Sequence, residues 1–231
     1  MEKKDFIVWA SKLQSQYQPS EEVSRKLNNI ELVALVGPTG VGKSTLIDKL
    51  DIPDVLSDVT RDPRPDEKDN QNYHFRKDYF NILDEIKAGQ YVQFLIGSNG
   101  EFYGTRASAY PDNGRCAMAV LASEVPHFQS LGFKKLTLFY IMPPSYVEWM
   151  RRIGGVRAKD LLSRIGEARD SLTLAVNSED YVFILNDTLE LAVRDMKNML
   201  NGEPVDEHRS RLAKGTADIL LERVGDEESD E

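Results

Sequence analysis

Hydrophobic residues in this chain gather in short uninterrupted runs, and longer amphipathic stretches lie between the runs. The run over residues 31–36 ends at Gly37, which is typical of a strand buried on both faces of a parallel sheet. In the stretches between runs, hydrophobic residues recur at helical spacing. Strands alternating with helices indicate an α/β fold with a mainly parallel central sheet and flanking helices. The predicted strands cover residues 31–36, 91–96, 115–121, 136–142 and 181–185, and the predicted helices 43–50, 78–88, 124–131, 144–153, 160–176 and 189–200.

Both ends of the chain carry a helical pattern outside this alternation. Residues 1–29 are predicted to form a helical N-terminal extension, because Phe6, Trp9 and Leu13 are spaced as on one helix face. The break at residues 19–22 marks the start of a second helix. We expect this extension to pack against the domain, with a partner-binding arm as the alternative. Residues 202–231 are predicted to hold one helix, over 206–224, and an acidic tail.

Composition limits the classes of function. The 231 residues are 41% hydrophobic and 29% charged, as in ordinary globular proteins, and no apolar stretch approaches the ~18 residues that span a bilayer. The net charge of −9 argues against general nucleic-acid binding. Five acidic residues lie in 226–231, so the body is only mildly acidic. The single cysteine, Cys116, fits a cytoplasmic setting and a small buried residue. We therefore expect no nucleic-acid and no membrane partner.

Residues 37–44 match the phosphate-binding pattern GxxxxGK[ST] between a predicted strand and a predicted helix. Glycines in such a loop let backbone N–H groups point at phosphate oxygens, and the helix N-terminus adds a positive dipole end. Lys43 would neutralise the β- and γ-phosphates, and the Ser44 hydroxyl would bind Mg²⁺. The pattern predicts a nucleoside-triphosphate site formed by Gly37, Pro38, Thr39, Gly40, Val41, Gly42, Lys43 and Ser44, with Thr45 directly after them.

The phosphoryl acceptor is expected in the polar insertion over residues 51–75, which is too polar to predict a core segment. Arg61 and Arg64 stand three residues apart around a proline that stiffens the chain. Two guanidinium groups beside the Tyr73 hydroxyl would bind a phosphate monoester. The alternative is that both arginines form surface salt bridges with the many acids nearby.

This insertion resembles the nucleoside-monophosphate-binding segment of the guanylate kinase family. The matching positions are Ser57, Thr60, Arg61, Pro63, Arg64, Glu67, Tyr73 and Phe75. The segment departs from the family at two glycines, which are Asp66 and Asn70 here. Since Asp and Asn tolerate left-handed backbone best among non-glycine residues, we expect the turns to survive.

The resemblance continues to about residue 200 in several motifs that occur in the family's order. It implies a P-loop NTPase fold over residues 30–201, with a monophosphate-binding insertion at about 52–105 and a lid at about 151–165. The lid arginines would be Arg152 and Arg164, which with Lys43 and Arg61 form the expected catalytic set. The resemblance further implies that Asn186 lies near the adenine of ATP. The monophosphate would be bound by Ser57, Arg61, Arg64, Glu67, Tyr73, Gln93, Tyr103 and Thr105.

Two departures leave the acceptor open. The family has a glutamate at about the position of Gln93, where its carboxylate accepts from guanine; an amide offers one acceptor and a mismatched NH₂. The family's acidic strand corresponds to residues 117–122, which hold no carboxylate. The resemblance implies an ATP- and Mg²⁺-dependent kinase for GMP or dGMP, acting as a monomer or homodimer. The alternatives are a kinase for another (deoxy)nucleoside monophosphate, or a catalytically weak module that binds a nucleotide or a protein.

Overall fold

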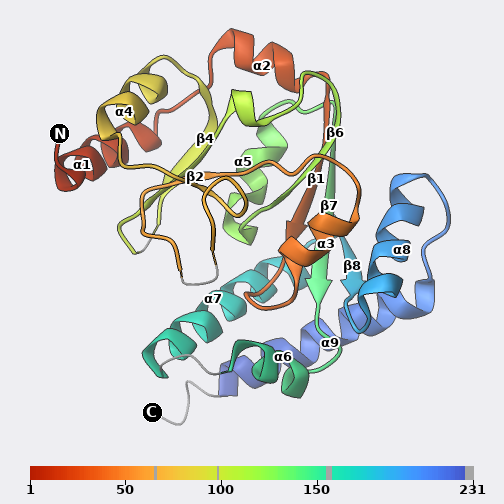
Figure 1. Cartoon of the computed structure of the whole chain (residues 1–231). Coiled ribbons are helices and arrows are strands. Elements are labelled where there is room, and N and C mark those ends of the chain that lie inside the picture. The colour runs from red at the N-terminus through yellow and green to blue at the C-terminus, as the bar shows by residue number, and fades with distance from the viewer. Residues whose placement is uncertain (65–66, 98, 155–157, 227–231) are drawn as a thin grey trace. The chain divides into compact units, whose positions relative to one another are not determined.

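Strand β1 (Ile30–Val36) belongs to a four-stranded sheet with the order β6-β1-β7-β8 in the computed structural model (Figure 1). The other strands are β6 (Gly114–Ala119), β7 (Lys135–Met142) and β8 (Tyr181–Leu185). β7 and β8 run parallel, with Leu138 opposite Tyr181 and Met142 opposite Leu185. Every residue of β1 except Glu31 is buried, as its apolar run predicts. The sheet confirms the predicted α/β class.

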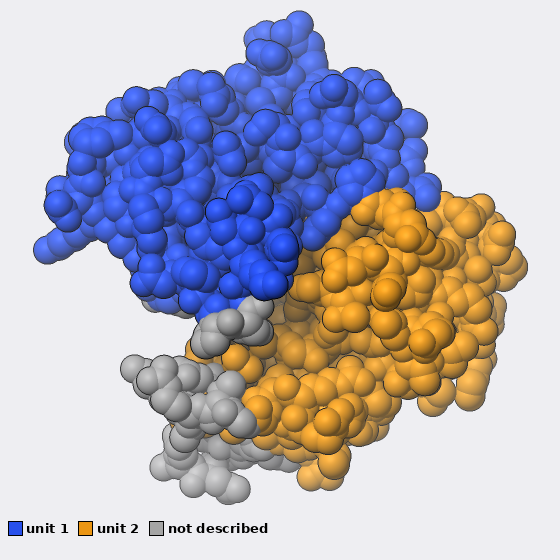
Figure 2. Space-filling model, in the orientation of Figure 1, with its two compact units in different colours: residues 1–32, 53–116, 129–135 blue, residues 33–52, 117–128, 136–231 orange. Residues whose placement is uncertain are grey.

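The structure describes residues 1–64, 67–97, 99–154 and 158–226, with the backbone alone at 158–160 and 226. The chain divides into two units, each assembled from segments distant in the sequence (Figure 2). The first unit comprises residues 1–32, 53–116 and 129–135. The second comprises residues 33–52, 117–128 and 136–231. The phosphate-binding pattern therefore lies in the second unit, and residues 53–75 of the polar insertion lie in the first.

The helices agree with the predicted ranges to within two residues at most of their ends. α9 packs along α7 and β8 in the second unit. The expected lid includes residues 155–157, which lie outside the described residues, as do residues 227–231 of the acidic tail. Among the helices as described, none is both long and apolar enough to cross a membrane. The helices are α1 (Lys3–Gln14), α2 (Glu21–Leu27), α3 (Lys43–Lys49), α4 (Tyr79–Lys87), α5 (Val125–Ser130), α6 (Tyr146–Ile153), α7 (Ala158–Val176), α8 (Leu189–Leu200) and α9 (Glu207–Asp226), with short 3₁₀ turns at Ala107–Ala109 and Ala122–Glu124.

The first unit contains a second sheet, with the order β3-β2-β5-β4, to which the polar insertion contributes β2 and β3. Its strands are β2 (Asp58–Val59), β3 (His74–Phe75), β4 (Tyr91–Ile96) and β5 (Phe102–Arg106). β5 pairs antiparallel with both β2 and β4. Of these strands, the hydrophobic pattern predicts only β4. β2 and β3 are two residues long, too short to show a period.

The expectation that this insertion is too polar for the core is wrong at residues 58–60, which are buried. The Asp58 carboxylate accepts hydrogen bonds from Tyr91 Oη at 2.6 Å, Arg76 Nη1 at 2.9 Å and Arg106 Nη2 at 3.1 Å. A buried carboxylate is tolerated where cations and donors surround it. The pairing partners come from three other places in the sequence, so the local composition gives no sign of them.

The N-terminal helix α1 packs against α4 and β4 within the first unit, as predicted. Phe6 and Ala10 are fully buried in a core shared with Phe102. Ser20 caps α2 by accepting a hydrogen bond from Val23 N at 3.3 Å, which agrees with the predicted helix start. Cys116 is buried with a free thiol, as expected for a small core residue.

Candidate functional site

The loop between β1 and α3 has the backbone that the phosphate-binding pattern requires. Gly37, Gly40 and Gly42 have φ values of +137°, +82° and +96°, which L-residues with side chains rarely adopt. A Cβ on Gly42 would lie 2.6 Å from Asn186 Nδ2, and one on Gly37 would lie 2.6 Å from Ile141 O. The two glycines are therefore needed both for the turn and for close packing.

Side-chain donors hold four carbonyl groups of this loop. Lys43 Nζ donates to Gly37 O at 2.6 Å and to Pro38 O at 2.9 Å. Trp149 Nε1 donates to Thr39 O, and Asn186 Nδ2 donates to Val41 O at 2.7 Å. Within the described parts of the chain, the backbone N–H groups of residues 39–44 have no acceptor. The loop thus has its carbonyls satisfied and its amides available, which is the arrangement that receives phosphate oxygens.

Burial lowers the pKa of the Lys43 ammonium from 10.5 to about 8, because the surroundings of the loop solvate the charge less well than water does. Bound phosphate would stabilise the ammonium and raise its pKa again. Above pH 8 the free protein has partly lost this proton, so ATP binding must take one up. We predict that the Kd for ATP rises as the pH increases from 8 to 9.5, by up to about tenfold per unit.

Calorimetry in two buffers of different ionisation enthalpy measures this proton uptake directly. At pH 9 we expect uptake approaching one proton per ATP, and little uptake at pH 6.5. Lys43→Arg is the control, since an arginine does not titrate in this range. Equal proton uptake by the wild type and by Lys43→Arg would contradict the assignment to this side chain.

The predicted lid arginines belong to the second unit, as does the loop. Arg152 on α6 donates to Glu148 Oε1 at 2.9 Å and to Asn186 O at 3.1 Å. Arg151 and Arg152 lower the pKa of the Glu148 carboxyl to about 2 through their hydrogen bonds. Arg164 lies on α7 and is partly exposed. Arg152 is thus linked to the same residue, Asn186, that holds the loop.

The residues expected to bind the acceptor lie in the first unit, where Arg61 forms a bidentate pair with Glu67. Arg61 Nη1 and Nη2 lie 2.5 and 2.7 Å from the two Glu67 oxygens, and the guanidinium carbon lies 4.9 Å from the Tyr73 ring centre and 5.4 Å from that of Phe75. Glu67 also accepts from Arg64 N at 2.8 Å. The structure therefore gathers Glu67, Tyr73 and Phe75 of the motif around the Arg61 guanidinium. The spacing of Arg61 and Glu67 in the sequence does not predict that they form an ion pair.

The turn at Asn70, where the family has a glycine, keeps the left-handed backbone that we expect there. Asn70 has φ +60°, in the left-handed region, and its N–H donates to Tyr73 O at 2.9 Å. Asp66, the other substituted glycine, lies outside the described residues. The prediction that asparagine can replace glycine in this turn is confirmed.

Gln93 and Thr105 lie opposite each other on β4 and β5. Gln93 is 6% exposed, and its Oε1 has no hydrogen-bond partner in the described structure. The Thr105 hydroxyl is bonded to Tyr110 Oη at 3.1 Å in a buried position. Tyr103 Oη accepts from Asn99 Nδ2 at 2.9 Å, and the carbonyl of Ser57 accepts from His74 N. The orphaned Gln93 oxygen is the notable feature, since a buried acceptor without a donor costs about 1–3 kcal/mol.

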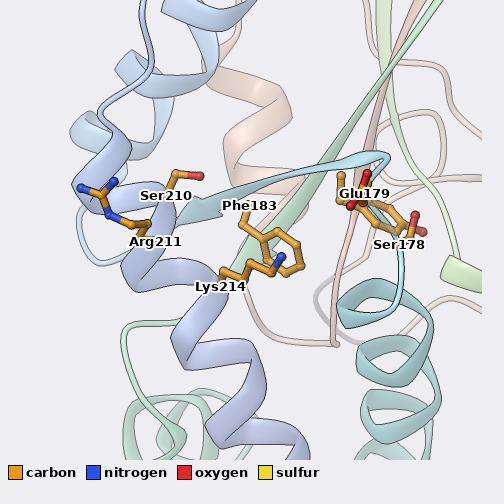
Figure 3. A pocket seen from close by; sticks show the side chains of 7 residues that line it. Ser178, Glu179, Phe183, Ser210, Arg211 and Lys214 are labelled. Carbon is orange, nitrogen blue, oxygen red and sulfur yellow. The ribbon is translucent and has the colours of Figure 1, made fainter.

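A cavity of about 330 Å³ lies elsewhere in the second unit, between β8 and α9 (Figure 3). Phe183 lies among its lining residues, with Arg211 and Lys214 of α9 nearby in the view. None of the predicted site residues lines this cavity. It is therefore separate from the candidate site.

Comparison with known proteins decides which family these features belong to. A family model described as guanylate kinase matches residues 29–203. The chain belongs to the guanylate kinase family. A Synechococcus guanylate kinase is 30% identical over 201 residues, covering 81% of this chain and 88% of the relative. A guanylate kinase of Oceanobacillus iheyensis is 31% identical over 201 residues, covering 82% of this chain and 94% of the relative.

The fold of the guanylate kinase family is also found by structural comparison. The crystal structure of guanylate kinase from Anaplasma phagocytophilum superposes with a TM-score of 0.54 at 24% identity, covering 78% of this chain and 89% of the other. The predicted family and the predicted P-loop NTPase fold are confirmed. The family match ends before α9 and begins after α1 and α2.

Proposed function

We propose that this chain transfers the γ-phosphoryl group of ATP to GMP, which yields ADP and GDP. The observation that carries the proposal is the loop at residues 37–44, with its unpaired amides and the partly buried Lys43 ammonium, in a member of the guanylate kinase family. The relatives named above are themselves guanylate kinases. Phosphoryl transfer requires positioning and charge stabilisation more than covalent chemistry by the protein, and this loop supplies both.

On the donor side, the amides of residues 39–44 would bind the phosphates of ATP, and Lys43 would exchange its two carbonyl acceptors for phosphate oxygens. Ser44 and Thr45 are exposed in the first turn of α3. The described residues contain no cluster of three or more His, Cys, Asp and Glu able to hold a metal ion by themselves. Mg²⁺ would then be held by the Ser44 hydroxyl and the phosphates, where it would neutralise the charge on the transferred group.

On the acceptor side, Arg64 would supply the net charge that attracts the monophosphate. Glu67 already neutralises Arg61 through two hydrogen bonds, whereas the Arg64 side chain has no hydrogen bond or ion pair within the residues that the structure describes. Burial raises the pKa of Tyr73, so its hydroxyl stays a donor to an anion. Arg61 and Tyr73 would orient the phosphate, and Tyr103 would add a second hydroxyl.

During transfer, Arg152 and Arg164 would stabilise the charge that spreads over the moving phosphoryl group. The acceptor oxygen of GMP is already anionic, so no general base is needed. The assignment of Asn186 to the adenine side stays a prediction, as do a cytoplasmic setting and a monomeric or homodimeric state.

The side chain at position 93 allows a prediction about selectivity for the guanine base. Its unpaired Oε1 can accept from one guanine N–H, but its NH₂ group opposes a second donor. We expect Gln93→Glu to raise kcat/KM for GMP by about ten- to a hundredfold, because a carboxylate offers an acceptor to both donors. IMP lacks the 2-amino group, so its kcat/KM should rise less. An unchanged ratio of GMP to IMP in the variant would show that residue 93 does not face the base.

The reaction itself is tested by following ADP formation from ATP and Mg²⁺ with GMP, dGMP, AMP, UMP, CMP and dTMP in turn. We expect turnover with GMP and dGMP and little with the others. Turnover with a different acceptor would favour the second hypothesis, a kinase for another nucleotide. If all six failed, the third hypothesis, a weak binding module, would replace the proposal.

A further inference from the structure

Helix α9 lies outside the residues that match the guanylate kinase family, yet it reaches the segment after β8 through Arg209. Arg209 Nη1 and Nη2 donate to the two Asp187 oxygens, each at 2.8 Å. Nη2 also donates to Leu185 O at 2.9 Å, and Nε donates to Asp195 Oδ2 at 2.6 Å. The Arg209 side chain is only 11% exposed and that of Asp195 3%. One buried guanidinium therefore joins α9 to the end of β8 and to α8.

Arg209 fixes both neighbours of Asn186 along the chain. It binds the carbonyl of Leu185 on one side and the carboxylate of Asp187 on the other. Its hydrogen bonds lower the pKa of the Asp187 carboxyl to about 2. Asp187 Oδ1 also accepts from Thr188 N at 2.7 Å, at the start of α8. The backbone of residues 185–188 is thus held in one arrangement.

Asn186 transmits this arrangement to the phosphate loop. Its side chain is buried and donates to Val41 O at 2.7 Å. The space above Gly42 is filled by the same amide group, since a Cβ there would lie 2.6 Å from Asn186 Nδ2. A shift of Asn186 would therefore either break its bond to the loop or push against the backbone at residues 41–42.

We propose that Arg209 is a positioning residue for the donor nucleotide: α9 sets the geometry of the phosphate loop through Asp187 and Asn186. This proposal rests on one part of the proposed function, namely that the loop at residues 37–44 binds ATP. Arg209 itself touches no phosphate in this scheme. It acts by limiting the positions of Asn186, so its loss should weaken ATP binding and leave GMP binding unchanged.

The test is the Kd for ATP, measured by calorimetry in the absence of GMP, so that it does not depend on turnover. We expect Arg209→Ala to raise this Kd about tenfold, as a coupling between neighbouring networks typically does. Asp187→Asn should have a similar but smaller effect, since it keeps the shape and weakens the charge pairing. Arg209→Lys should keep the positive charge and therefore restore part of the affinity for ATP. The restoration should be incomplete, because one ammonium cannot replace the bidentate pair.

Arg211→Ala is the matched control, since Arg211 lies on the same helix and pairs only with the exposed Glu207 among the described residues, at 3.3 Å. It should leave the Kd for ATP unchanged. KM for GMP should be equal in all variants. A wild-type Kd for ATP in Arg209→Lys and Asp187→Asn would overturn the proposal, even if Arg209→Ala were unstable, and so would an equal loss in Arg211→Ala. Failure of the wild type to bind ATP would instead refute the proposed function.

Discussion

Replacement of Lys43 by methionine should lower kcat/KM for ATP by about a thousandfold or more. Methionine keeps the apolar stem but removes the charge that would face the phosphates. Loss of a cation that stabilises the transferred phosphoryl group raises the activation free energy by about 4 kcal/mol. The measurement is ADP formation at saturating GMP over a range of ATP concentrations. Lys49→Met is the control, because Lys49 is exposed at the other end of α3.

The same substitution should not destabilise the fold. The folded-state pKa of Lys43, about 8, is below its ordinary value, so the charged form costs folding free energy below pH 8. This cost disappears as the pH rises from about 8 towards 10.5. At pH 7 we therefore expect Lys43→Met to unfold in urea at a concentration no lower than the wild type. An active Lys43→Met variant would contradict a role of Lys43 in ATP binding. A variant that unfolds at a lower urea concentration than the wild type would contradict the expected stability.

Asp58→Ala should destabilise the first unit by about 3–5 kcal/mol. The substitution leaves Arg106 without the carboxylate that it pairs with at 2.9 Å, and it removes the nearest acceptor of the buried Tyr91 hydroxyl, which keeps only Glu85 Oε2 at 3.3 Å. Arg76 keeps Asp78 and Glu85, so the loss falls mainly on Arg106 and Tyr91. Urea unfolding measures the loss of stability. Amide hydrogen exchange of β2, β4 and β5 shows whether the loss is located in this sheet.

Asp62→Ala is the matched control for the buried carboxylate. Asp62 pairs with Lys77 at 2.8 Å, but its side chain is 88% exposed. Its loss should cost under about 1 kcal/mol, as for exposed ion pairs generally. Equal stability losses in the two variants would show that the Asp58 network contributes no more than a surface pair.

The elements of this fold were largely predictable because their signals are local. The apolar run of β1 and the glycine-rich loop after it identify a strand, a turn and a helix from adjacent residues. β5 was missed because Gly104 interrupts its pattern, and β2 because two residues cannot show a period. Asp58 shows the limit more clearly: its burial depends on Arg76, Tyr91 and Arg106, which only the folded sheet brings together.

Some residues of the candidate site could likewise be predicted from local motifs, and others could not. Lys43, Arg61 and Tyr73 follow from motifs, and the left-handed Asn70 follows from the chemistry of asparagine. The Arg61–Glu67 pair and the Arg209–Asp187 pair could not be predicted, since a surface charge and a buried partner look alike in a sequence. The unpaired Gln93 oxygen is likewise a property of the environment of that residue.

Transfer of the labelled γ-phosphoryl group tests the central claim most directly. ATP carrying ³²P in the γ position is incubated with GMP, Mg²⁺ and the full chain, and the products are separated. We predict that the label appears in GDP, in an amount equal to the ADP formed, and that none appears in Lys43→Met. Release of the label as inorganic phosphate, or its retention in ATP, would contradict phosphoryl transfer between two nucleotides.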